Sequence, residues 1–124
     1  MVLLGDYVTL AGMVAVHQFC NIGRHAFIAG GSLVRKDIPP FVKAAREPLS
    51  YVGINSVGLR RRGFSSEKIR EIQNIYRIVF QKKFNNTQAI NIIEAEVEAT
   101  SDRDEILVFI KDSQRGIMKG YIQN

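Results

Sequence analysis

The first part of this chain repeats an aliphatic residue at every sixth position. The six positions are Leu4, Leu10, Val16, Ile22, Ile28 and Val34. A period of six fits neither an amphipathic helix nor an alternating strand. It is typical of the hexapeptide repeat of a parallel β-helix, in which each hexad forms one short strand and one corner. We therefore expect these side chains to point inward and to stack on their equivalents in neighbouring coils.

Two further hexad positions support this interpretation. The residue after the aliphatic is small in four of the six hexads, and the fifth residue is small or apolar throughout: Val8, Val14, Cys20, Ala26, Ser32 and Ile38. Cys20 is the single cysteine and stands at an inward position, so we expect a core filler rather than a nucleophile. The absence of a possible intrachain disulfide favours a reducing, cytoplasmic setting.

The six hexads account for only a short stretch of solenoid. Three hexads make one triangular coil, so the chain carries about two coils, near the repeat number needed for stability. The sequence begins directly on the first hexad, without a capping segment. We expect the C-terminal end of a longer solenoid; the alternative is a complete small domain whose first coil is covered by a partner chain.

Three segments are expected. Residues 1–41 form the coils, which end at Pro39 and Pro40 because proline cannot donate to a strand ladder. Residues 42–64 form an extended connection, with Pro48, Gly53, Gly58 and Gly63 as punctuation. Residues 65–124 form a three-helix domain. The fold class is thus β-helix plus α, a parallel β-helix stub followed by a small helical domain.

Helix start signals divide the last segment. Ser65 or Ser66 caps a first helix that has Ile69, Ile72, Tyr76, Val79 and Phe80 on one face. Thr87 caps a second helix, and a third begins at Ser101. The tail after Gly116 is expected to fray.

Charge is unevenly distributed along a chain of net charge +5. Residues 60–83 carry +6 and residues 94–105 carry −5. Such a pair of clusters is more often solvated surface or a match between subunits than a nucleic-acid site, and no aromatic interleaving supports nucleic-acid binding. A basic face can instead attract an acidic carrier protein or a phosphorylated substrate. No apolar run has membrane-spanning length.

Several runs resemble one known family. They are Val16-His17-Gln18-Phe19-Cys20-Asn21-Ile22-Gly23, Asp37-Ile38-Pro39-Pro40-Phe41, Gly53-Ile54-Asn55 and Gly58-Leu59-Arg60-Arg61-Arg62-Gly63-Phe64. Together they look like the bacterial UDP-N-acetylglucosamine acyltransferase, which performs the first step of lipid A synthesis. The resemblance covers the whole chain. Its specific parts are the run beginning at Val16 and the run ending at Phe64.

The resemblance implies a homotrimer of left-handed β-helices with active sites in clefts between subunits. The family moves a 3-hydroxyacyl chain from acyl carrier protein to the 3-hydroxyl of UDP-N-acetylglucosamine, without a metal or other cofactor. Its general base is a His followed by an acid, in coils upstream of this sequence, and a second family His falls at Met1. The resemblance therefore implies that this chain holds no catalytic residue and is inactive alone.

Five substrate-binding residues follow from the resemblance. His17 stands at a hexad position normally reserved for a small residue, and it and Gln18 match residues that contact the acylated sugar. Asn55, Arg61 and Arg62 match residues that bind the UDP moiety, and guanidinium suits a pyrophosphate because its fork gives bidentate hydrogen bonds. Without the family match, His17 would be a structural or an outward-facing residue, and the arginines would be part of a basic turn before a helix.

Three further residues support the family resemblance less directly or depart from the family pattern. Gly30 matches the position that sets acyl length, but a corner glycine explains it equally well. Val57 stands where the family often has Glu, which removes one polar nucleotide contact. His25 is expected to be structural or outward-facing.

Other functions remain possible from the sequence. His17 and His25 lack a third ligand at a suitable spacing, which weakens a metal-dependent hydratase. A related N-acyltransferase fits the ArgArgGlyPhe run less well. The alternative from another class is a non-catalytic trimerising module that binds a UDP-sugar or a carrier protein.

Overall fold

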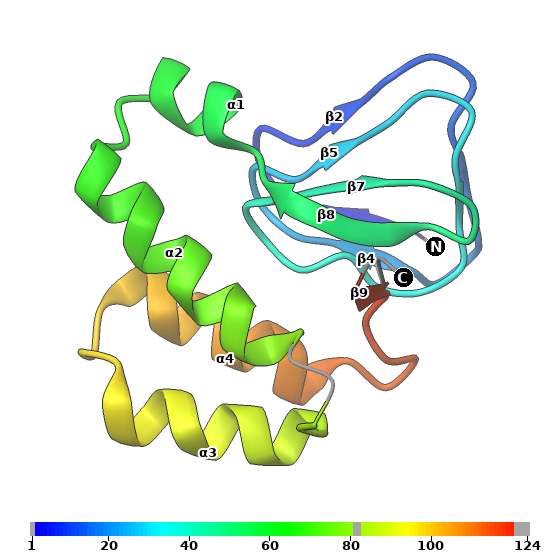
Figure 1. Cartoon of the computed structure of the whole chain (residues 1–124). Coiled ribbons are helices and arrows are strands. Elements are labelled where there is room, and N and C mark those ends of the chain that lie inside the picture. The colour runs from blue at the N-terminus through cyan, green and yellow to red at the C-terminus, as the bar shows by residue number, and fades with distance from the viewer. Residues whose placement is uncertain (1, 81–82, 121–124) are drawn as a thin grey trace.

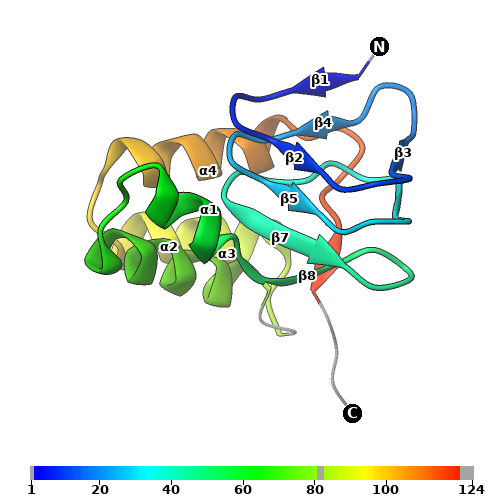
Figure 2. The same cartoon turned by 90° about the horizontal axis from the view of Figure 1, so that it is seen from above.

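The first part of the chain is a solenoid of short parallel strands in the computed structural model, which describes residues 2–80 and 83–120. Its six strands are β1 (Leu3–Leu4), β2 (Thr9–Leu10), β3 (Ala15–Val16), β4 (Asn21–Ile22), β5 (Phe27–Ile28) and β6 (Leu33–Val34). Strand β1 pairs with β4, β2 with β5 and β3 with β6, each in parallel register 18 residues apart (Figure 2). One coil is therefore three hexads, as the repeat predicts.

The corners of the coils share one backbone conformation. The fourth residue of each of the first five hexads has a positive φ, between 61° and 75°: Tyr7, Met13, Phe19, His25 and Gly31. A residue other than glycine in this region costs on the order of 1 kcal/mol or more. Pairing between the coils thus overrides the local preference of four large side chains.

The aliphatic positions fill the interior, but unequally in the two coils. Ile22, Ile28 and Val34 of the second coil are at most 2% exposed, whereas Leu4 and Leu10 of the first coil are 53% and 39% exposed. The second coil is covered on both sides. The first coil forms an open end of the described structure.

Cys20 is fully buried, and its Sγ lies 3.8 Å from the carbonyl oxygen of Val34. Burial raises the pKa of this thiol. Only a thiolate is a good nucleophile, so the raised pKa makes Cys20 a poor one. Cys20 is therefore a core residue, as the sequence predicts.

The two prolines do not end the solenoid, contrary to the sequence-based prediction. Ile38 forms a parallel bridge to Ile22, and strand β7 (Val42–Ala45) pairs in parallel with β5, with Ile28 opposite Ala44. These offsets are 16 residues instead of 18. Ile38 therefore occupies a stacking position, and the prolines lie in a shortened corner. Gly23 is needed here, because a Cβ on it would lie 2.4 Å from the Pro40 nitrogen.

Residues 42–64 are not the extended connection that the sequence predicts. Strand β7 forms an antiparallel hairpin with β8 (Ser50–Ile54), and helix α1 (Ser56–Arg61) follows. The register shifts between Lys43 and Ala44, opposite Gly53, whose φ is 144°. Gly53 therefore allows a β-bulge-like irregularity within the strand pair, at a position where the sequence suggested a break in the chain's regular structure.

Three helices follow, with the predicted number and slightly different caps. Helix α2 (Ser66–Val79) has Ser65 as its N-cap, and its buried residues are Ile69, Ile72, Ile75, Tyr76 and Val79. Helix α3 (Asn86–Glu96) is capped by Asn85 and not by Thr87, because Asn85 and Gln88 form a reciprocal capping box. Helix α4 (Ser101–Asp112) is capped by Thr100.

The tail does not fray through residue 120. Strand β9 (Lys119–Gly120) pairs in parallel with β8. The buried carboxylate of Asp37 accepts hydrogen bonds from the Asn21 backbone N–H at 2.8 Å and the Ser113 hydroxyl at 2.6 Å. The Met118 N–H donates to the Asp37 carbonyl oxygen. Residues 121–124 lie outside the described residues.

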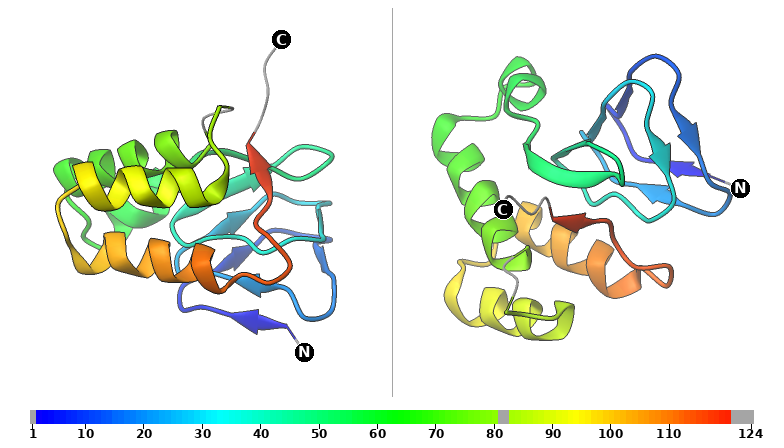
Figure 3. Two further views of the ribbon diagram at one scale, coloured as in Figure 1. Left: turned by 90° about the horizontal axis from the view of Figure 1, so that it is seen from below. Right: turned by 45° about the vertical axis from the view of Figure 1, so that its right-hand side comes forward.

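The helices pack on one side of the solenoid, and α3 lies on the side of α2 and α4 away from it (Figures 1 and 3). The hydroxyl of Tyr76, a fully buried residue of α2, donates to the Pro40 carbonyl oxygen at 2.6 Å. This bond joins α2 to the corner that contains the two prolines. Helix α2 is thereby tied to the end of the coil stack.

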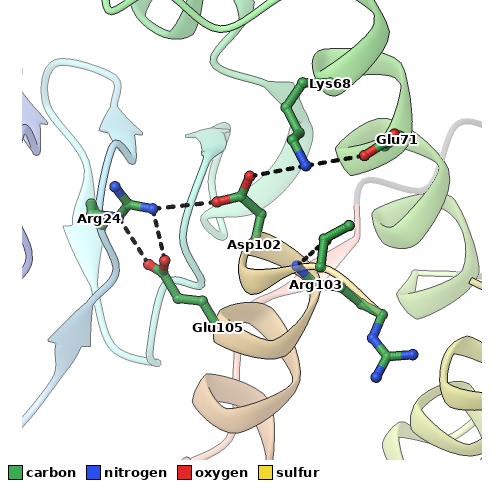
Figure 4. Close-up of polar contacts among 7 residues, drawn as sticks. Arg24, Lys68, Glu71, Asp102, Arg103 and Glu105 are labelled. Atoms are coloured by element: carbon green, nitrogen blue, oxygen red, sulfur yellow. Dashed lines mark hydrogen bonds and ion pairs between the residues drawn. The ribbon is translucent and has the colours of Figure 1, made fainter. Parts of the chain in front are cut away.

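An ion-pair network makes the second junction (Figure 4). Arg24, from the corner between β4 and β5, donates to both carboxylate oxygens of Glu105, at 2.8 and 3.2 Å, and lies 3.4 Å from Asp102. Asp102 also pairs with Lys68 of α2 at 3.4 Å, and Lys68 pairs with Glu71. The pKa of Arg24 is raised, chiefly by its hydrogen bond to Glu105. Part of the acidic run is therefore neutralised within the chain.

Replacing Tyr76 by Phe tests the α2 junction. The Tyr76→Phe variant should lose about 1–3 kcal/mol in free energy of unfolding, because a buried carbonyl oxygen loses its donor. Urea unfolding followed by circular dichroism measures this loss. Tyr51→Phe is the matched control, since the Tyr51 ring stacks on Tyr76 with centroids 5.7 Å apart. Equal losses in both variants would contradict a role for the Tyr76–Pro40 bond.

Candidate functional site

A pocket of about 380 Å³ lies where α1 meets one face of the solenoid. Strands β2, β5 and β7 provide that face, and the end of β8 with α1 provides the opposite wall. The pocket is lined by Thr9, Phe27, Lys43, Ile54, Asn55, Ser56, Val57, Gly58 and Arg61. It combines two cations and one amide with an apolar surface.

Asn55 has a structural role besides its place in the pocket wall. It is the N-cap of α1, because its Oδ1 accepts from the Gly58 N–H at 3.3 Å. Its Nδ2 donates to the backbone oxygen of His25 at 2.9 Å. A Cβ on Gly58 would lie 2.5 Å from that Nδ2. Asn55 thus both starts the helix and fastens it to a corner of the second coil.

The Gly63-Phe64 pair ends α1. The Gly63 N–H donates to the Arg60 oxygen and the Phe64 N–H to the Leu59 oxygen, with Gly63 at a φ of 90°. These two bonds form a Schellman motif, in which the residue after the cap is usually glycine. Half of the ArgArgGlyPhe run is therefore explained by helix termination.

Arg61 and Arg62 point to different surroundings. Arg61 lines the pocket. The Arg62 guanidinium carbon lies 4.2 Å above the centre of the Tyr7 ring. Tyr7 in turn stacks on His25, with ring centroids 4.9 Å apart.

His25 is a buried structural residue, which agrees with one of the two sequence-based interpretations. It is 3% exposed, stacks on Phe41 and meets the edge of Phe64. Its pKa is lowered, first by burial and then by the positive charge of Arg24, with a smaller effect from Arg62. The acids of α4, Glu105 and Asp102, oppose these effects.

Within one chain, the predicted site residues are not all brought together. Asn55 and Arg61 share the pocket, whereas Arg62 is not among the residues that line it and lies over the Tyr7 ring. His17 and Gln18 are exposed at the corner between β3 and β4, away from the face that lines the pocket. The Gln18 carbonyl oxygen accepts from Arg115.

Gly30 and Met1 are the two other positions that the resemblance pointed to. Gly30 is exposed at the corner between β5 and β6, where a Cβ would approach the Gly12 oxygen to 3.1 Å. Met1 lies outside the described residues.

The sequence did not point to Lys43, Thr9 or Phe27. Lys43 is the exposed residue of β7, and its Nζ lies 5.6 Å from the centre of the Phe27 ring. An outward lysine on a strand carries no motif, so only the stacking of β7 on β5 reveals its place. Val57 also lines the pocket and is 61% exposed, so it adds an apolar side chain to the pocket wall.

Among residues 2–80 and 83–120, no three His, Cys, Asp or Glu side chains are grouped so that they could hold a metal ion. In the same residues, no helix has the length and apolar character to cross a membrane.

A sequence model of the family described as UDP-N-acetylglucosamine O-acyltransferase, domain 2, matches residues 37–118. This chain belongs to that family. The matched segment contains α1 and its capping residues. It also contains all three charged or amide side chains of the pocket: Asn55 and Arg61, to which the sequence pointed, and Lys43, to which it did not.

Individual proteins that are similar to this chain carry the same name as the family. The chain is 41% identical over 118 residues to the acyl-(acyl-carrier-protein)–UDP-N-acetylglucosamine O-acyltransferase of Myxococcus xanthus, covering 95% of this chain and 46% of that protein. The crystal structure of a UDP-N-acetylglucosamine acyltransferase from Bacteroides fragilis superimposes with a TM-score of 0.93 at 45% identity, over 95% of this chain and 46% of the other. The Arabidopsis enzyme gives a TM-score of 0.87 at 32% identity, over 95% and 44%. The chain thus spans about half the length of these relatives.

The buried His25 should make folding sensitive to pH. The folded pKa lies below the unfolded value of about 6.5, so the unfolded state binds more protons as pH falls. The contribution of His25 to stability is present above pH ~6.5 and decreases as pH falls below it. The free energy of unfolding of the wild type should therefore fall more steeply between pH 7.5 and 5 than that of His25→Phe.

Urea unfolding at several pH values measures this difference. Phenylalanine is a suitable replacement because Phe19 and Phe41 already adopt a φ of 72°. His17→Gln is the control that removes the other histidine, which is exposed. A wild-type slope in His25→Phe would show that His25 does not cause the pH dependence.

Proposed function

We propose that this chain is the nucleotide-binding part of an O-acyltransferase of lipid A biosynthesis. The reaction moves a 3-hydroxyacyl chain from acyl carrier protein to the 3-hydroxyl of UDP-N-acetylglucosamine. The observation that carries the proposal is the pocket in which Arg61, Lys43 and Asn55 meet, within the segment that the family model matches. The names of the relatives supply the acceptor and the acyl donor.

The chemistry of the pocket suits a nucleoside diphosphate sugar. A guanidinium and an ammonium group can pair with a diphosphate, and the arginine fork allows two parallel hydrogen bonds. Both Arg61 and Lys43 are solvent-exposed and available to a ligand. Phe27, Ile54 and Val57 offer an apolar surface next to these charges.

We further propose that the active enzyme is a homotrimer of left-handed coils. His17 and Gln18 lie at a different corner from the pocket of their own chain. A cleft between subunits would let these two residues of one copy face the pocket of another. Gly30, at an exposed corner, would then leave room for a long acyl chain, because any larger side chain would take up space there.

The acyl transfer needs a base that this chain does not supply. The oxygen of the sugar hydroxyl bonds to the thioester carbonyl carbon, its proton passes to a base, and the carrier thiolate leaves and takes up a proton. A hydroxyl group of high pKa needs such a base poised near neutral pH. The two histidines here, His17 and His25, are followed by Gln18 and Ala26, so neither has the adjacent acid of the family's base.

Isothermal titration with UDP-N-acetylglucosamine tests the pocket. Arg61→Ala should weaken binding roughly 10- to 100-fold, the effect of losing charge-assisted hydrogen bonds. Arg60→Ala is the matched control, because Arg60 is an exposed neighbour on the same helix that does not line the pocket. Equal losses in the two variants would point to general attraction by the basic helix and would contradict a specific site.

An acyl-transfer assay separates the enzyme from its alternative. With acyl carrier protein as donor, this chain alone should show no turnover above background, whereas the chain joined to the upstream half of a relative should be active. Turnover by the chain alone at a comparable rate would contradict the missing base. Binding of the UDP-sugar with no turnover by the joined protein would favour the non-catalytic trimerising module.

A further inference from the structure

Arg62 is held at both ends. It is the C-cap residue of α1, and its backbone N–H donates to the oxygens of Gly58 and Leu59. Its guanidinium carbon lies 4.2 Å from the centre of the Tyr7 ring, within the range of a cation–π interaction. A long side chain that is free in solution is thus fixed between a helix end and a corner of the first coil.

The Tyr7 ring is itself supported from below. It stacks on His25 with centroids 4.9 Å apart and an angle of 21° between the rings. His25 stacks on Phe41 and meets the edge of Phe64, the residue that completes the end of α1. The column of rings therefore connects the two coils to the helix that carries the arginines.

The backbone of Tyr7 has the conformation shared by the other corners, so it is the exposed aromatic ring at this corner that needs an explanation. Its side chain is 54% exposed, and its backbone has a φ of 61°, a strained value for a bulky residue. An exposed ring at a strained corner contributes little to a core. Its contact with Arg62 gives the ring a use.

We propose that Tyr7 is a positioning residue that holds the Arg62 guanidinium ready to bind the diphosphate of the UDP-sugar, an inference that rests on the proposed function. Ordering a flexible arginine side chain on binding costs rotamer entropy. The column of rings meets part of that cost before the ligand arrives, which raises affinity through preorganisation.

A double-mutant cycle tests the proposal by titration with UDP-N-acetylglucosamine. Tyr7→Leu should weaken binding by about two- to fivefold, the range of an exposed cation–π contact. Tyr7→Phe should bind like the wild type because it keeps the ring. In an Arg62→Ala background, Tyr7→Leu should have no further effect, since Tyr7 acts through Arg62.

Met13→Leu is the matched control. Met13 occupies the equivalent position of the next hexad, with a φ of 62° and 92% exposure. The Met13→Leu variant should bind UDP-N-acetylglucosamine with wild-type affinity. This result would separate the role of the Tyr7 ring from a general effect of changing a corner residue. Thermal unfolding of both variants shows whether either substitution alters the fold.

The outcomes are distinguishable. Wild-type affinity in Tyr7→Leu, or an equal loss in the Arg62→Ala background, would overturn the positioning role while leaving the proposed function intact. Absence of binding by the wild-type chain would overturn the proposed function, and the role of Tyr7 with it.

Discussion

The structure depends on backbone pairing between consecutive coils. Each of the first six strands is only two residues long, so no strand is stable alone and its hydrogen bonds come from the coil next to it. This requirement fixes the 18-residue coil and places a positive φ at corners occupied by Tyr7, Met13, Phe19 and His25. It also accounts for the difference between coils: the second is covered on both sides, and the first keeps Leu4 and Leu10 partly exposed.

The helical part stabilises the end of the stack by two chemically different junctions. Tyr76 joins α2 to Pro40 through a buried neutral hydrogen bond, and Arg24 joins the coil to α4 through Glu105 and Asp102. Arg24 is about one-third exposed, so solvent weakens its ion pairs, and the buried bond contributes more per contact. Together with the tail at Asp37, these junctions explain why the coils, the hairpin and the helices share one core.

The residues around α1 combine architecture with binding chemistry. Asn55 starts the helix and Gly63 and Phe64 end it, which leaves Arg61 and Arg62 on one short, well-anchored turn. A motif that suggests ligand binding in the sequence is thus in part a set of helix caps. The two arginines are adjacent in sequence but face different partners, a pocket in one case and an aromatic ring in the other.

The sequence by itself determined the coil length, the inward stacking of Ile22, Ile28 and Val34, and the start of α2 after a serine cap at Ser65 or Ser66. These features depend on local spacing, which any window of the chain displays. The tertiary structure alone decided that the stack continues past Pro40 to β7, that Lys43 joins the pocket, that Arg62 rests on Tyr7, and that His17 lies at another corner. Each of these depends on which coil faces which, and a two-residue shortening of one corner changes that partner for every residue that follows.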